Sequence, residues 1–238
     1  MLRIAAVILL TMVLVVLIGM IRQHDSARIV SAHVINMDKS ADRLAEFQQN
    51  ALRGGLVVTR WPAVDGSRIG EADLVSLGLS KYIYKYSQEH KQPGLLGCFL
   101  SHRGLLRHLE KMRCGADDAH IIFEDDAYVP VDFMKEYNSV VRDLPADWDM
   151  VQLGVTFPNL RPYRGRLHRH LGDKGNVGGF AYMVRHGSLR KINTAVAVMY
   201  DPMDVMLRNQ WKTWKMYILW PELCPHNDHG ESIIVTKQ

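Results

Sequence analysis

Apolar and polar positions along the chain alternate between two periods, one typical of strands and one typical of helices. The run 29–35 is apolar and rich in β-branched side chains, which predicts a buried strand. A partial apolar face over 43–53 then predicts a helix, which the glycine pair 54–55 ends. A second strand is expected over 56–59.

The same alternation continues to the end of the chain, with apolar positions at helical spacing followed by short apolar runs. The further elements predicted in this way are helices near 71–77, over 94–112 and near 187–198, and strands at 120–123, 150–153 and 180–184. The tyrosine-rich interval 80–92 is less regular. Alternation of this kind is typical of an α/β domain with a mostly parallel sheet and helices on both faces.

One segment departs from this pattern. Residues 4–21 carry no charged side chain over 18 positions, and Arg3 and Arg22 border them. A helix of that length spans most of a hydrocarbon layer of roughly 30 Å. We therefore expect an N-terminal transmembrane helix within 1–28 and a single-pass membrane protein. A cleaved signal peptide and a buried soluble helix are the alternatives, and basic residues at both ends leave the membrane side open.

Composition restricts the partners of the domain. A net charge of +4 and 47% apolar residues are those of an ordinary globular protein. Basic residues gather in 161–170, either to meet an anionic diphosphate or a membrane surface or as a solvated loop. Aromatic and basic residues do not interleave as in nucleic-acid-binding proteins, so nucleic acid is not expected as a partner. Cys98, Cys114 and Cys224 form no CxxC pair, which suits reduced thiols and leaves one disulfide open.

Acidic side chains follow two of the predicted strands, at the strand ends where open α/β sheets bind ligands. One end is the segment 36–38, and the other is Glu124-Asp125-Asp126. On an extended backbone Glu124 and Asp126 point to one side and Asp125 to the other. Two carboxylates on one side suit Mn²⁺ or Mg²⁺ bound to a diphosphate. A solvated acidic turn is the alternative.

Several short blocks of the chain occur together in one known family. They are 34–38 with Arg43, 63–66, 97–102 and 122–126, with weaker agreement at 178–182 and 202–204. In their order and spacing they resemble glycosyltransferase family 25, which includes bacterial lipooligosaccharide galactosyltransferases and procollagen galactosyltransferases. The resemblance extends over roughly 29–235, and the Ser101-His102 block with the acidic triplet is its most specific part.

The resemblance implies a fold of the nucleotide-diphospho-sugar transferase (GT-A) type, with 29–238 as the glycosyltransferase catalytic domain. It also implies an inverting mechanism, a UDP-sugar donor (usually UDP-galactose), and a glycan, lipooligosaccharide or protein-linked acceptor. By position it places six residues at the donor, among them an arginine whose guanidinium suits a phosphate. These donor-binding candidates are Asn36, Asp38, Arg43, Asp65, Ser101 and His102.

An inverting transfer also needs a group that takes the proton of the acceptor hydroxyl. Asp204 is the first candidate for this base, with Asp125 as a second catalytic candidate. Glu124 and Asp126 are the expected metal ligands, and His226 is a candidate third ligand. The alternatives are a helix cap for Asp204 and a polar tail loop for His226.

Two other functions compete with sugar transfer. A catalytically inactive, membrane-tethered protein could bind carbohydrate or a nucleotide sugar without turnover. A metal-dependent phosphoesterase could use the acidic triplet, but it would leave the Ser101-His102 block without a role. Release of nucleoside diphosphate in the presence of metal and donor would indicate transfer rather than an inactive binding protein. Release of free phosphate would indicate a phosphoesterase.

Overall fold

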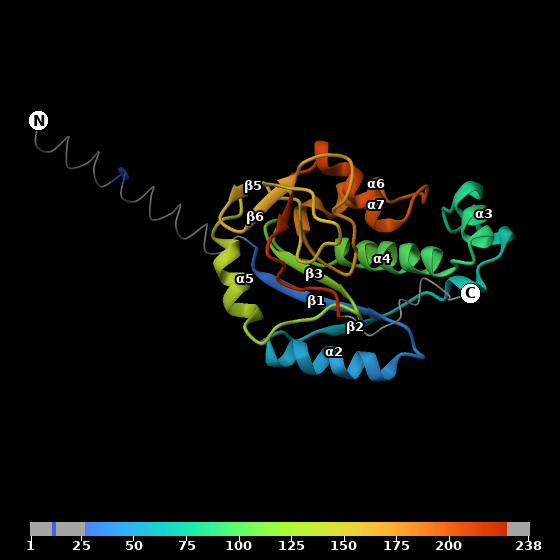
Figure 1. The fold of residues 1–238 in the computed structure, drawn as a ribbon, viewed down its shortest axis with the longest axis horizontal. Coiled ribbons are helices and arrows are strands. Elements are labelled where there is room, and N and C mark those ends of the chain that lie inside the picture. Colours follow the sequence, from blue (N-terminus) through green and yellow to red (C-terminus); the bar gives the residue numbers. More distant parts are fainter. Residues whose placement is uncertain (1–10, 13–26, 228–238) are drawn as a thin grey trace, which may run out of the picture.

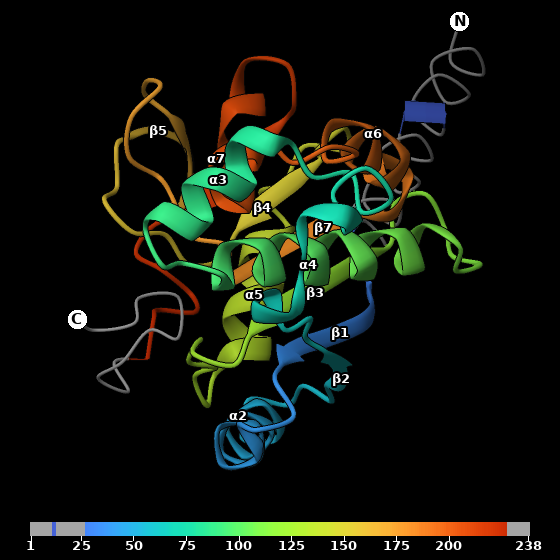
Figure 2. The same ribbon diagram turned by 90° about the vertical axis from the view of Figure 1, so that its right-hand side faces the viewer.

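The computed structural model describes residues 11–12 and 27–227. An eight-stranded sheet forms the centre, in the order β2-β1-β3-β7-β4-β8-β6-β5 (Figures 1 and 2). Its strands, in chain order, are β1 (Ile29–Asn36), β2 (Thr59–Pro62), β3 (Ala119–Glu124), β4 (Met150–Gln152), β5 (Leu160–Arg164), β6 (Leu167–His170), β7 (Ala181–Arg185) and β8 (Met216–Leu219).

The sheet is mixed, so the predicted mostly parallel sheet is wrong. β1 pairs in parallel with β2 and β3, and β4 with β8, but β7 runs antiparallel between β3 and β4. The cause is the connection between β4 and β7. It forms the β5–β6 hairpin at the edge of the same sheet and contains no crossover helix, so β7 runs antiparallel to β4.

Helices cover both faces of the sheet, as predicted for an α/β domain. They are α2 (Ala41–Arg53), α3 (Lys81–Glu89), α4 (Gly94–Glu110), α5 (Phe133–Val141), α6 (Leu189–Ala195) and α7 (Met203–Arg208), with 3₁₀ turns η1 (Gly66–Arg68), η2 (Glu71–Asp73), η3 (His186–Ser188) and η4 (Asn209–Lys212). Helices α2 and α4 lie on opposite sides of β1 and β3 (Figure 1). Each face therefore has its own apolar core.

The two cores meet at β3, whose side chains alternate between them. Ile121 and Phe123 pack into the core that holds Phe47 of α2 and Phe133 of α5. Ile122 packs into the other core with α4, α6 and α7. Because β3 is buried on both faces, it is apolar from Ile121 to Phe123, and its acidic end marks the point where the sheet meets a cavity.

Local predictions differ from the structure at several places. The strand expected over 56–59 is β2, which starts only at Thr59. Leu56 N bonds back to Ala51 O at the end of α2, so the strand begins later than predicted. The interval 80–92 holds α3, and the helix expected near 71–77 contains only the 3₁₀ turn η2. The basic run 161–170 is mostly the β5–β6 hairpin rather than a loop, and β8 was not predicted.

The prediction of a transmembrane helix and a single-pass membrane protein requires correction. In 11–12 and 27–227, no helix has both the length and the apolar character needed to cross a membrane. The longest helix in this part, α4, has 17 residues, and charged residues such as Arg103 and Arg107 interrupt its apolar surface. Of the predicted span 4–21, all but residues 11–12 lie outside the described residues. That prediction was based on the length and the uncharged character of this run.

Candidate active site

A cavity of ≈ 320 Å³ opens at the carboxyl ends of β1 and β3, where they meet the start of α4. It gathers residues from Ile35 to Asp126, which are 91 positions apart in the sequence. The predicted site residues on its wall are Asn36, Arg43, Asp65, Ser101, His102, Glu124, Asp125 and Asp126. Asp38, Asp204 and His226 do not line this cavity.

Asp125 sits in a buried polar network on the β1 side. Its carboxylate accepts a hydrogen bond from Asn36 Nδ2 at 2.6 Å and lies 2.8 Å from Arg43 Nη2. Burial raises the pKa of Asp125, while the hydrogen bond from Asn36 and the charge of Arg43 oppose that rise. The carboxylate is 6% exposed and already has two partners, so it holds Arg43 at the cavity wall.

Arg60 completes this network, and sequence reasoning missed it. Its Nε donates to Asn36 Oδ1 at 3.1 Å and its Nη2 to Asn36 O at 3.0 Å, and it forms an ion pair with Asp38. The Asp38 carboxylate is 91% exposed. Arg60 reaches this position because β2 pairs with β1 with Val34 opposite Arg60, which only the strand register reveals.

The wall opposite Arg43 is the loop before η1, and hydrogen bonds hold it against α4. Asp65 accepts hydrogen bonds from Ser67 N at 3.0 Å and Ser67 Oγ at 2.6 Å, which lower the pKa of Asp65. Ser101 accepts from Val64 N at 2.8 Å and donates to Gly97 O at 2.6 Å. Ser101 therefore joins the loop to the helix.

Two glycines allow the loop and α4 to touch backbone to backbone. A Cβ on Gly66 would lie 1.9 Å from Pro93 O, and one on Gly97 would lie 2.3 Å from Val64 O. No side chain fits at either position without separating the two segments. The close packing of the loop against α4 therefore requires glycine at both positions.

His102 and Glu124 form the floor beside α4. The His102 imidazole is fully buried, with Nδ1 2.9 Å from Tyr182 Oη and Nε2 3.2 Å from Glu124 Oε1. The possible ligand atoms of Cys98, His102 and Glu124 lie within 4.8 Å of one another. Burial raises the pKa of Cys98 well above its usual value, and the charges of Glu124, Asp204 and Asp126 add to this rise.

Asp126 lines the cavity and also contacts the segment 225–227. The segment 225–227 runs beside 126–128, with Asn227 N 2.7 Å from Asp126 O, and brings His226 Nε2 to 3.4 Å from Asp126 Oδ2. Asp126 Oδ1 is buried and has no hydrogen-bond partner within 27–227. Burial, followed by the charge of Glu124, raises the pKa of Asp126 to about 6.

The acidic residues present fit a divalent cation. A buried carboxylate oxygen without a donor is costly, and a nearby second carboxylate increases the cost. Oxygen ligands are those that Mn²⁺ and Mg²⁺ prefer, and an imidazole beside them suits Mn²⁺. Asp126 and His226 supply these donor types as a pair at the carboxyl end of β3, whereas the ligand atoms of Glu124 lie with those of Cys98 and His102.

Asp204 lies near this floor although it does not line the cavity. Its Oδ2 accepts a hydrogen bond from Gly178 N at 3.1 Å and its Oδ1 one from Val205 N at 2.9 Å. Its charge is one of those that raise the pKa of Cys98, which does line the cavity. Two backbone donors therefore fix the Asp204 carboxylate at the start of α7. Like Glu124 and Asp126, it is near enough to Cys98 for its charge to act on that thiol.

Comparison with known proteins identifies the family to which the chain is similar. The family model described as "Glycosyltransferase family 25 (LPS biosynthesis protein)" matches residues 30–164. A "Glycosyltransferase 25 family member" of Anopheles gambiae is 24% identical over 68% of this chain and 26% of its own length. One of Aedes aegypti is 29% identical over 55% of this chain and 22% of its own length. The chain thus spans about a quarter of the length of these relatives.

The matched region contains every predicted site residue that lines the cavity, from Asn36 to Asp126. Asp204 and His226 lie beyond it. The family match covers more than half of the 238 residues, and the resemblance seen in the short sequence blocks is confirmed. This chain belongs to glycosyltransferase family 25.

Proposed function

We propose that the chain is a metal-dependent, inverting glycosyltransferase with a UDP-sugar as donor. The transferred hexose is galactose from UDP-galactose, and it goes to a hydroxyl of a glycan, lipooligosaccharide or protein-linked acceptor. Family membership supports sugar transfer. The observation that carries the metal-dependent part is the buried Asp126 carboxylate, with one oxygen lacking a partner in the described residues and Glu124 near it at the cavity floor.

The cavity supports a nucleotide diphosphate as its ligand. Its ≈ 320 Å³ lies within the range of small-molecule sites. The loop of Asp65 forms one wall, where a ribose or base can meet a carboxylate, and Arg43 stands on another, where its guanidinium can face phosphate oxygens. Acidic side chains alone would repel a diphosphate, so donor binding at this floor requires a cation between them.

Glu124 and Asp126, with His226 beside Asp126, are the residues that would hold the cation. When bound there, a divalent cation supplies charge neutralisation for the departing diphosphate. The ion pair with Asp125 keeps Arg43 oriented toward the same ligand. Asp125 acts in this proposal as a positioning residue.

The transfer itself requires a base on the acceptor side. The acceptor oxygen bonds to the anomeric carbon as the bond from that carbon to the diphosphate oxygen breaks, with inversion. The acceptor proton passes to the Asp204 carboxylate, which Gly178 N and Val205 N hold in place. The electron pair of the broken bond remains on UDP.

Calorimetric titration of UDP into the full chain, with and without MnCl₂, tests the proposal. We expect Mn²⁺-dependent binding that Asp126→Asn and Glu124→Gln abolish. Asp132→Asn is the matched control, because Asp132 is an exposed acid at the start of α5 that caps no helix with its side chain. The same variants are assayed for UDP release from UDP-galactose with a panel of sugar acceptors.

The outcomes separate the competing functions. UDP binding without transfer or hydrolysis would favour an inactive nucleotide-sugar-binding protein. Release of free phosphate would favour a phosphoesterase. Wild-type turnover in Asp126→Asn would remove the metal role from this carboxylate and contradict the mechanism.

A further inference from the structure

Outside the active-site cavity, a second set of metal-ligating side chains comes together at the amino end of β3. Cys114 lies in the loop between α4 and β3, His120 is the second residue of β3, and His186 follows β7. Their possible ligand atoms all lie within 4.8 Å of one another. From these three residues we propose a Zn²⁺ site that is separate from the catalytic centre and stabilises this edge of the sheet.

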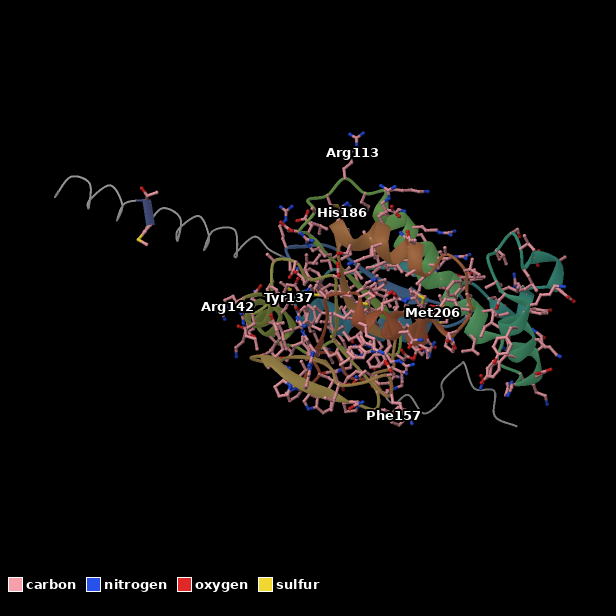
Figure 3. All side chains as sticks on the ribbon, turned by 90° about the horizontal axis from the view of Figure 1, so that it is seen from above. Arg113, Tyr137, Arg142, Phe157, His186 and Met206 are labelled. Carbon is pink, nitrogen blue, oxygen red and sulfur yellow. The ribbon has the colours of Figure 1, made fainter. Side chains whose placement is uncertain are left out.

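The backbone brings the three residues together through rigid connections. β3 and β7 are antiparallel neighbours, with Ala119 opposite Arg185, so His186 comes out of the sheet beside His120. Two further bonds join the loop to the turn, from His186 N to Asp118 O at 2.8 Å and from Gly187 N to Ala116 O at 2.9 Å. Figure 3 shows His186 at the same edge of the molecule as Arg113, the residue before Cys114.

The spacing of the ligand atoms suits a tetrahedral zinc ion. His120 Nε2 lies 3.0 Å from His186 Nδ1. Zn–N bonds of about 2.0–2.1 Å in a tetrahedron place two nitrogens about 3.3 Å apart, and a sulfur and a nitrogen roughly 3.6 Å apart. The observed nitrogen–nitrogen distance is therefore within a few tenths of an ångström of that in a zinc ligand pair.

The surroundings orient the ligands as metal sites do. Ser31 Oγ lies 2.7 Å from His120 Nδ1, which leaves the opposite nitrogen to face the metal. The nearby Asp118 is bound to Arg28 at 3.1 Å and Gly115 N at 2.7 Å. Asp118 is therefore not one of the metal ligands.

Access and charge balance follow from the position of Cys114. It lines a shallow surface cavity with Arg113, Gly115 and Asp118, through which a hydrated ion reaches the ligands. Binding exchanges the Cys114 thiol proton, which is released to water, for a Zn–S bond. Water fills the fourth position. Because four strand steps of about 3.3 Å separate His120 from Glu124 along β3, the site lies about 13 Å from the catalytic floor.

The proposal does not depend on sugar transfer, and its test reads metal binding directly. The metal-free full chain is titrated with Zn²⁺ while its melting temperature is followed. With Zn²⁺ at about 100 times its dissociation constant, we expect a rise of about 5–10 °C. Cys114→Ser and His186→Asn, both at half-buried positions, should abolish the rise. His90→Asn, an exposed histidine at the end of α3, is the matched control and should keep it.

Cobalt substitution distinguishes this site from the Cys98, His102 and Glu124 cluster of the cavity. A Co²⁺–thiolate bond gives a charge-transfer absorption that reports which cysteine is bound. We expect the band to survive Cys98→Ser and to disappear when Cys114→Ser is added to that variant. A band that depends on Cys98 alone, or a chain that Zn²⁺ does not stabilise, would show that His120 and His186 are only hydrogen-bonded to each other and would overturn the proposal.

Discussion

The carboxylate of Asp126 should make the metal-free protein less stable at neutral pH than at acidic pH. Its pKa of about 6 in the folded protein compares with 3.8 for an ordinary aspartate. Folding therefore disfavours ionisation of this carboxylate. The contribution of its protonated form to the free energy of unfolding is fully present below pH 4 and is lost as the pH rises through about 6. A shift of this size corresponds to about 3 kcal/mol, and because the side chain is 21% exposed we expect about 2–3 kcal/mol.

Asp126→Asn removes the charge and should flatten this dependence. At pH 7.5 in EDTA, the variant should unfold at a temperature about 4–12 °C above that of the wild type, and at pH 4 the two should agree. Adding MnCl₂ should raise the melting temperature of the wild type and of the Asp132→Asn control, but not that of Asp126→Asn. Thermal melts at four pH values measure this, with Asp132→Asn as the control. A variant that is no more stable than the wild type at pH 7.5 would refute a cost from the buried Oδ1 oxygen, which has no hydrogen-bond partner in the described residues.

Two further predictions concern packing and charge at the cavity walls. Gly97→Ala should destabilise the fold by about 1–3 kcal/mol, because its Cβ would lie 2.3 Å from a backbone oxygen. Gly104→Ala in the same helix is the control. Its Cβ would lie 3.6 Å from the nearest atom, so this change should be neutral or stabilising by up to ~1 kcal/mol. Equal urea midpoints for the two variants would contradict the close contact at Gly97. Arg43→Ala should cost about 3–5 kcal/mol because it leaves Asp125 buried without its cation. The same denaturation assay should show a smaller loss when Asp125→Asn accompanies it, and additive losses would contradict the pairing.

The sequence predicted the site better than it predicted the sheet. Polar residues that follow apolar strands mark the carboxyl ends of those strands, and this rule brought Asn36 and Glu124 to one cavity. The direction of β7 could not be predicted in this way, because its apolar run is the same for a parallel or an antiparallel neighbour. The four-residue strand β8 is likewise too short for a periodic signal, although all its residues are buried.

Residues whose position depends on register or on distant loops were the ones missed. Arg60 acts through its place opposite Val34, and nothing in its local sequence distinguishes it from a surface arginine. His120 and His186 are 66 positions apart and meet only because β7 runs beside β3. Family resemblance supplied His102, whose helical position alone would indicate a buried structural histidine.

The pairing of 225–227 with 126–128 also bears on how the chain folds as it is synthesised. Asp126 and His226 are 100 positions apart, so at roughly 5–20 residues per second His226 follows Asp126 by roughly 5–20 s. During that interval β1, β3 and α4 have left the ribosome before the segment that covers Asp126 exists. The acidic end of β3 therefore remains hydrated on the nascent chain, and the cost of burying its charge arises only when 225–227 pairs with 126–128.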